Sequence, residues 1–287
     1  MAAIYKREIH SLFTSMTAYI FITFYLLILG IYFRYYNLSY GATTIGYPIY
    51  QCFFIYMLFA LLTMRSLPEE RKEKIDQVLY TSPVSVGKIV IGKYLAMCTV
   101  WALTTAVICI FPLVIKKLGY AALKTEYSII VAYFLLGCAF IAISMFISSL
   151  TESQLTSAIV SVIVIFLVCF ASSFAQAFGT GAYISLISFL LIAAIIGAIF
   201  GWFTHNLAYG LTSGISLACI AVIIYIVKKS LFEGAIQKVI SKIALSETIY
   251  SFIFDKTFDL KIIFTYVSII VLFLFITVQT IQKRRYS

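Results

Sequence analysis

The feature that most constrains this chain is a run of 75 residues, from Ser153 to Val227, without Asp, Glu, Lys or Arg. A typical soluble domain carries about 25% charged residues, whereas this chain carries 11%, with 63% hydrophobic residues and a mean hydropathy of +1.05. A soluble fold of 287 residues could not bury so much apolar surface, so lipid must surround much of the chain. The predicted fold class is therefore an all-α polytopic membrane protein.

Charge-free windows long enough to cross a bilayer recur along the sequence. A helix of about 20 apolar residues crosses about 30 Å of hydrocarbon. Polar or glycine-rich breaks at residues 178–181 and 204–206 divide the long uncharged run into three such windows. We predict one domain, residues 1–287, with about eight spans at residues 16–36, 46–65, 94–115, 127–150, 155–173, 183–203, 208–227 and 261–282.

Residues 4–16 have the pattern of a helix that lies on the membrane instead of crossing it. Tyr5, Ile9 and Leu12 fall on one helical face, while Lys6 and Arg7 fall on the other. An apolar stripe opposite basic residues is typical of an amphipathic helix in the membrane interface. We therefore predict an N-terminal interface helix.

The segment from Arg65 to Asp76 is highly charged, unlike the apolar stretches on either side of it. It holds eight charged residues in twelve positions. Ser66 and Glu69 have the spacing of a capping box, which marks the start of a helix. Pro83 disfavours a helical conformation at the preceding residue. These signals predict a charged helix over about residues 67–80, outside the bilayer.

The basic excess of +10 does not indicate a nucleic-acid-binding protein, because Lys and Arg flank apolar spans instead of forming a stripe. An even number of spans places both termini on one side. Cytoplasmic termini put 11 of the 21 Lys and Arg residues inside, so the positive-inside rule discriminates little. The basic residues 283–285, directly after the last span, favour cytoplasmic termini.

No sequence motif for catalysis, cofactor binding or metal binding is present. The two histidines, His10 and His205, are not part of an H-E-x-x-H motif, and no G-x-x-x-x-G-K-[ST] phosphate loop occurs. The six cysteines lie in apolar stretches without C-x-x-C spacing. We therefore predict a chain that is not an enzyme and that takes any energy for transport from another subunit.

The charged segment and its flanks resemble the first cytoplasmic loop of bacterial ABC transporter permeases of the ABC-two class, in the gliding-motility-type and multidrug-type groups. The matching residues, in order, are 69–71 (Glu-Glu-Arg), 81–83 (Thr-Ser-Pro) and 92–93 (Gly-Lys). Residues 148–154, which include Glu152, resemble the second cytoplasmic loop, and residues 257–287 the last span. Members of this class usually have six spans, so residues 183–227 would be an additional pair.

The resemblance implies the permease subunit of an ATP-binding-cassette exporter in the bacterial plasma membrane. Two permease chains, identical or homologous, would assemble with two ATPase subunits, which bind the ATP and Mg²⁺. The helix at 67–80 would be the coupling helix that docks on the ATPase. Its expected coupling residues, with one from the second loop, are Glu69, Glu70, Arg71, Ile75, Val78, Leu79 and Glu152. The alternatives are a non-transporting immunity or sensor subunit and an integral membrane enzyme, and the sequence indicates no substrate.

The predicted orientation can be tested by cysteine labelling in a cysteine-free background. In intact cells, an impermeant thiol reagent should label Thr125→Cys and Lys238→Cys but not Glu73→Cys, because only the first two positions are predicted to be external. The measurement is the labelled fraction before and after cell lysis. The reverse pattern would contradict cytoplasmic termini.

Overall fold

The computed structural model describes residues 2–72, 85–119, 122–177 and 260–286, together with scattered positions between Tyr183 and Ile253. Within these residues all regular structure is helical and no strand occurs, which confirms the predicted all-α class. The chain forms two compact units, one of residues 1–169 with 245–287 and one of residues 170–244. The sites discussed below lie in the first unit.

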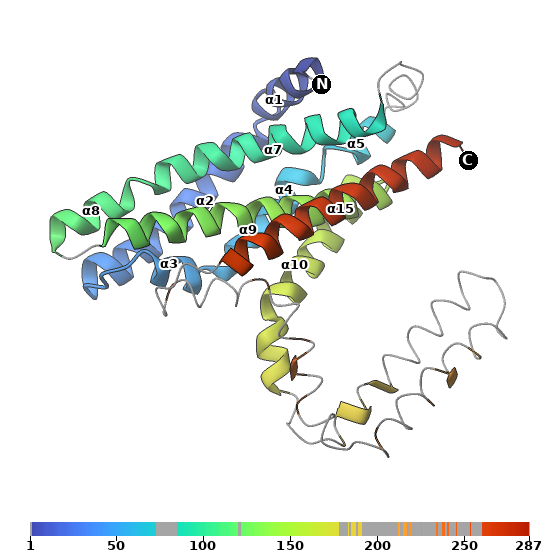
Figure 1. Cartoon of the computed structure of the whole chain (residues 1–287). Coiled ribbons are helices and arrows are strands. Elements are labelled where there is room, and N and C mark those ends of the chain that lie inside the picture. The colour runs from blue at the N-terminus through green and yellow to red at the C-terminus, as the bar shows by residue number, and fades with distance from the viewer. Residues whose placement is uncertain are drawn as a thin grey trace. The chain divides into compact units, whose positions relative to one another are not determined.

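Figure 1 colours the helices by their order along the chain, from blue at the N-terminus to red at the C-terminus. The first unit contains α1 (Ala2–Thr14), α2 (Thr17–Phe33), a π-helix η1 (Arg34–Ser39), α3 (Gly46–Gln51), a 3-10 helix η2 (Phe53–Met57), α4 (Leu58–Thr63), α5 (Pro68–Lys72), α7 (Val86–Ile108), α8 (Phe111–Leu118), α9 (Leu123–Leu150) and α15 (Leu260–Tyr286). Helix α10 (Gln154–Ala177) begins in the first unit and ends in the second.

Helix α9 is the central element of the first unit. Its most apolar window is 78% buried, whereas the corresponding windows of the other long helices are 17–39% buried. It packs against α4, α7 and α15, and Figure 1 shows it running between α7 and α15. The exposed faces of the surrounding helices are apolar, as expected of helices that face lipid.

Five of the predicted spans are present as helices long and apolar enough to cross a membrane. They cover Thr17–Ser39, Val86–Leu118, Leu123–Leu150, Gln154–Gln176 and Leu260–Lys283. The predicted spans at 183–203 and 208–227 fall largely outside the described residues, so the total of eight stays a prediction. A helix is present at the predicted interface segment (α1), and α5 begins where the charged helix was expected; residues 73–84 lie outside the described part.

The predicted span at 46–65 differs from expectation, because it consists of three short helical pieces, α3, η2 and α4. The α-helical pattern is interrupted at Cys52, and the 3-10 turn that follows has a tighter repeat than an α-helix. Ile49, Cys52, Ile55 and Tyr56 are all buried across this change of geometry. The sequence contains no proline or glycine between 49 and 65 to signal the break.

An aromatic cluster joins α2, α4, α7 and α9. The Trp101 ring on α7 lies 4.9 Å from Tyr25 and 5.0 Å from Phe59 between ring centroids. The indole N–H donates to the Phe134 carbonyl at 3.0 Å, and the hydroxyls of Tyr25 and Tyr133 are hydrogen-bonded at 2.6 Å. Apolar burial and satisfied polar groups therefore coexist in this core, as they must away from water.

Gly137 on α9 permits the close approach of Trp101. A Cβ atom at residue 137 would lie 2.3 Å from Trp101 Nε1 and 2.9 Å from a ring carbon of Phe59. Neither ring can move freely, because both are fully buried in the aromatic cluster. The position therefore requires glycine for space.

We predict that Gly137→Ala destabilises the protein by about 1–3 kcal/mol, the usual cost of overpacking a core. Gly30→Ala is the matched control, since a Cβ at that helical glycine of α2 meets nothing within 4 Å. The measurement is the midpoint of thermal unfolding of both variants in detergent. Equal unfolding midpoints for the two variants would show that the core accommodates the added methyl group by a shift of Trp101.

Candidate functional site

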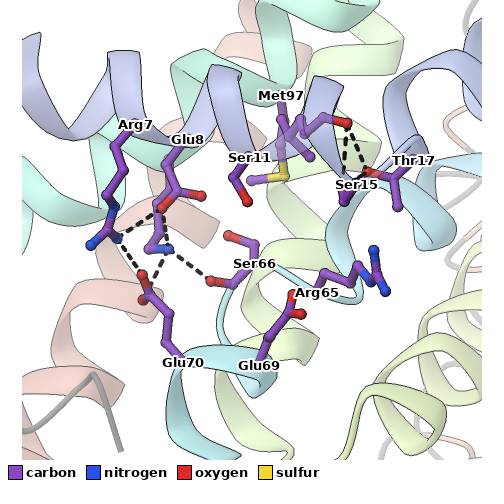
Figure 2. A pocket seen from close by; sticks show the side chains of 12 residues that line it. Arg7, Glu8, Ser11, Ser15, Thr17, Arg65, Ser66, Glu69, Glu70 and Met97 are labelled. Atoms are coloured by element: carbon purple, nitrogen blue, oxygen red, sulfur yellow. Dashed lines mark hydrogen bonds and ion pairs between the residues drawn. The ribbon is translucent and has the colours of Figure 1, made fainter. Parts of the chain in front are cut away.

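Four charged side chains from three helices meet at one end of the first unit. Lys93 of α7 forms ion pairs of 2.9 Å with both Glu8 of α1 and Glu70 of α5. Arg7 of α1 pairs with the same two carboxylates, with Glu8 at 3.0 Å. Lys93 also donates a hydrogen bond of 2.8 Å to the Ser66 carbonyl. Figure 2 shows these interactions along one wall of a pocket. We call these four residues the charge cluster.

The charge cluster follows from the position of Lys93 on the buried face of α7. This helix begins at Val86, earlier than the predicted span, and its residues Val86, Val90 and Met97 are buried on the same side as Lys93. The Lys93 side chain is only 1% exposed, whereas the two glutamates are 13% and 14% exposed. A buried ammonium is tolerated only with charged or hydrogen-bonding partners. The two glutamates and the Ser66 carbonyl together supply three oxygen acceptors.

The charge cluster is electrically balanced, with two cations and two carboxylates. Burial alone would lower the pKa of Arg7, but the hydrogen bond to Glu8 and the negative charges of Glu70 and Glu8 outweigh burial. The pKa of the Arg7 guanidinium therefore lies above its usual value. The ion pairs of the charge cluster therefore hold α1 and α5 against the N-terminal part of α7.

Arg71 fastens α5 to the central helix. Its guanidinium donates to the carbonyl of Thr151, at 2.7 Å, and to that of Ser149. These carbonyls lie at the C-terminal end of α9, where backbone acceptors lack partners within the helix. The Ser148 hydroxyl donates a hydrogen bond of 3.2 Å to the Thr63 carbonyl, which lies shortly before α5 in the chain. The charged helix and the loop that contains Glu152 are therefore adjacent.

A second polar site lies at the opposite end of α9. The buried carboxylate of Glu126, in the first turn of α9, accepts hydrogen bonds from the Ile45 N–H at 2.8 Å and the Thr44 hydroxyl at 3.2 Å. Asn37 donates to the carbonyls of Ala42 and Thr44. The connection between α2 and α3 is thus held at one end of α9, while α5 is held at the other.

The structure places the predicted coupling residues in different environments. Glu70 and Arg71 bond within the chain, Glu69 lines the pocket of Figure 2, and Glu152 is exposed. Ile75, Val78 and Leu79 lie outside the described residues. Nothing in these contacts tests the docking of an ATPase, so the coupling role stays a prediction.

Sequence reasoning did not predict the contribution of Glu8 and Lys93. The available signal was the apolar pattern at residues 86, 89, 90 and 97, which extends the buried face of α7 through Lys93. Within the described part of the chain, no group of three or more His, Cys, Asp or Glu residues could hold a metal ion. The six cysteines are free in the structure.

A comparison with protein families gives one match that bears on this site. The family model described as "ABC-2 family transporter protein" matches residues 34–180, which is more than half of the chain. The matched region includes α5, Lys93 and the end of α9. No curated protein and no solved structure shows significant similarity to the chain.

We predict that Lys93→Met destabilises the protein by about 2–4 kcal/mol, because two mostly buried carboxylates lose their shared cation. Adding Glu70→Gln to Lys93→Met should cost less than the sum of the two single substitutions, since the groups interact directly. The measurement is a double-substitution cycle of unfolding free energies in detergent. Strict additivity would show that the cluster does not act as a unit.

Proposed function

This chain belongs to the ABC-2 transporter family of membrane permeases, and we propose that it is the membrane-spanning subunit of an ATP-binding-cassette exporter. In this role it forms the substrate pathway, and a separate cytoplasmic ATPase subunit drives it. The observation that carries the proposal is the attachment of α5 to two candidate membrane spans, α7 and α9, by charged side chains. A charged loop without such contacts would not transmit a movement of the ATPase to the membrane spans.

The contacts of α5 divide its residues into two groups with different roles. Glu70 and Arg71 face the membrane-embedded helices, through Lys93 of α7 and the end of α9. These two residues would pass a displacement of α5 to α7 and to α9, the helix with the most extensive burial. They are transmitting residues, and a different set must contact the ATPase.

Exposed charges near α5 form the proposed docking surface. Lys72 ends α5 and is exposed, and Glu152 is exposed in the loop that Arg71 ties to α5. The predicted docking residues Ile75, Val78 and Leu79 follow directly in the sequence. Exposed charges at the rim of an interface adjust association and specificity more than raw affinity. Such a surface suits a partner that must rearrange during each ATP cycle.

The proposed assembly contains two permease chains, identical or homologous, and two ATPase chains that bind ATP and Mg²⁺. Figure 1 shows both chain ends at the end of the first unit that carries α5. If α5 meets a cytoplasmic ATPase, both termini are therefore cytoplasmic. The proposed location is the bacterial plasma membrane.

We predict a separation between docking and transmission. The double variant Lys72→Glu with Glu152→Lys should reduce recovery of the co-expressed ATPase about tenfold, which corresponds to about 1.4 kcal/mol of lost association. Glu70→Gln should leave recovery unchanged but reduce the change in ATP hydrolysis that the permease imposes on the ATPase. The measurements are co-purification yield and ATP hydrolysis of the complex relative to the isolated ATPase.

Lys117→Glu is the control, because this exposed lysine lies at the far end of the long helical span that contains Lys93. Lys117→Glu should change neither the co-purification yield nor the ATP hydrolysis of the complex. If none of the α5 and Glu152 variants altered recovery or hydrolysis, the coupling role would be refuted. A non-transporting membrane subunit would then be the better description.

A further inference from the structure

A polar pocket of about 260 Å³ lies beside the charge cluster, between α1, the start of α2, α5 and α7. Its walls include hydroxyl side chains such as Ser11 and Thr17, and two apolar residues, Leu12 and Met97. Figure 2 shows the ion-paired groups at one side of this pocket and the guanidinium of Arg65 at the other. A volume of this size suits a small polar group but not a large substrate.

Two side chains of opposite charge in this pocket, Arg65 and Glu69, stand apart from the charge cluster. The other four charged residues of its wall neutralise one another in the charge cluster. Among the residues that the structure describes, neither Arg65 nor Glu69 forms an ion pair. The Glu69 N–H bonds to the Arg65 carbonyl, so the two residues are one helical turn apart and their side chains are neighbours.

Two buried polar atoms in the same wall also lack hydrogen-bond partners among the described residues. They are the Nε of Arg65 and the hydroxyl oxygen of Ser66. Buried donors are almost always satisfied in folded proteins, and an unsatisfied one calls for a bound group or water. Both atoms belong to residues that line the pocket, and both can donate to an oxygen anion.

The position of the pocket indicates which molecules can reach it. Thr17 lines the pocket and is the first residue of the first candidate span, so the pocket lies where a helix enters the membrane. The adjacent α5 is too highly charged to lie in hydrocarbon. The pocket is therefore at the level of the lipid headgroups.

We propose that this pocket binds the headgroup of an aminophospholipid, with phosphoethanolamine as the recognised group. Arg65 and Ser66 donate to the phosphate, and Glu69 accepts from the primary ammonium. A guanidinium suits a phosphate because it offers several donors in a fixed geometry. A choline headgroup has no N–H to give to Glu69, and a glycerol headgroup has no cation. The site therefore selects for a primary amine.

This inference requires only the membrane location of the chain, not the coupling role proposed above. Its test accordingly measures lipid binding rather than transport. The full chain, purified in mild detergent and stripped of lipid, is titrated with phosphatidylethanolamine, phosphatidylcholine or phosphatidylglycerol. Native mass spectrometry counts the bound lipids. Inorganic phosphate is titrated separately to distinguish a free anion from a headgroup.

Phosphatidylethanolamine should bind the unmodified protein about tenfold more tightly than the other two lipids, the effect of one charge-assisted hydrogen bond. Arg65→Gln should weaken it about tenfold, and Arg65→Lys should recover part of the loss. Glu69→Gln should abolish the preference for the primary amine while the phosphate contact remains. Lys72→Gln and Glu152→Gln are matched controls, because they remove exposed charges of the same signs outside the pocket.

Three results would overturn the proposal. The first is equal binding of all three lipids to the unmodified protein. The second is a preference for phosphatidylglycerol that Glu69→Gln leaves unchanged. The third is displacement of bound phosphatidylethanolamine by millimolar inorganic phosphate, which would assign the pocket to a free anion. The helical circular dichroism of each variant is recorded first, and Arg65→Lys replaces Arg65→Gln if the latter does not fold.

Discussion

The burial of one ammonium group determines how the charged end of this permease is built. Lys93 is 1% exposed, and a lone cation in that position would be too costly to keep. Glu8 and Glu70 must therefore reach it from two other helices, which fixes the docking of α1 and α5 on α7. Arg7 then balances the second negative charge. The arrangement of α1 and α5 thus depends on a residue that belongs to neither helix.

The broad architecture could be predicted from the sequence because hydrophobicity along a helix is a local property. Windows such as residues 127–150 coincide with helices within a few residues. The break at Cys52 could not be predicted, since no proline or glycine between residues 49 and 65 marks it and the apolar pattern continues across it. The additional pair of spans near 183–227 stays a prediction, because those positions fall largely outside the described residues.

Part of the candidate site could be predicted from the sequence, because the density of charge, like hydrophobicity, is a local property of the chain. The density of charge at 65–76 identified a segment that cannot lie in lipid, and the family resemblance gave it a role. Which of its charges face inward depends on long-range contacts, such as Glu70 with Lys93 and Arg71 with Thr151. A sequence pattern contains no direct information on these pairs. The sequence therefore assigns Glu69, Glu70 and Arg71 the same coupling role, although their environments in the structure differ.

The order of the charge cluster along the chain has a consequence for biosynthesis. Glu8 and Glu70 both precede Lys93, so a chain made from its N-terminus presents both carboxylates before the lysine emerges. Arg71 likewise precedes the carbonyls at the end of α9, and Thr44 precedes Glu126. Each of these polar contacts forms when the later helix packs against an earlier segment. Insertion of α7 and then of α9 therefore completes, step by step, the polar contacts that the first helices leave open.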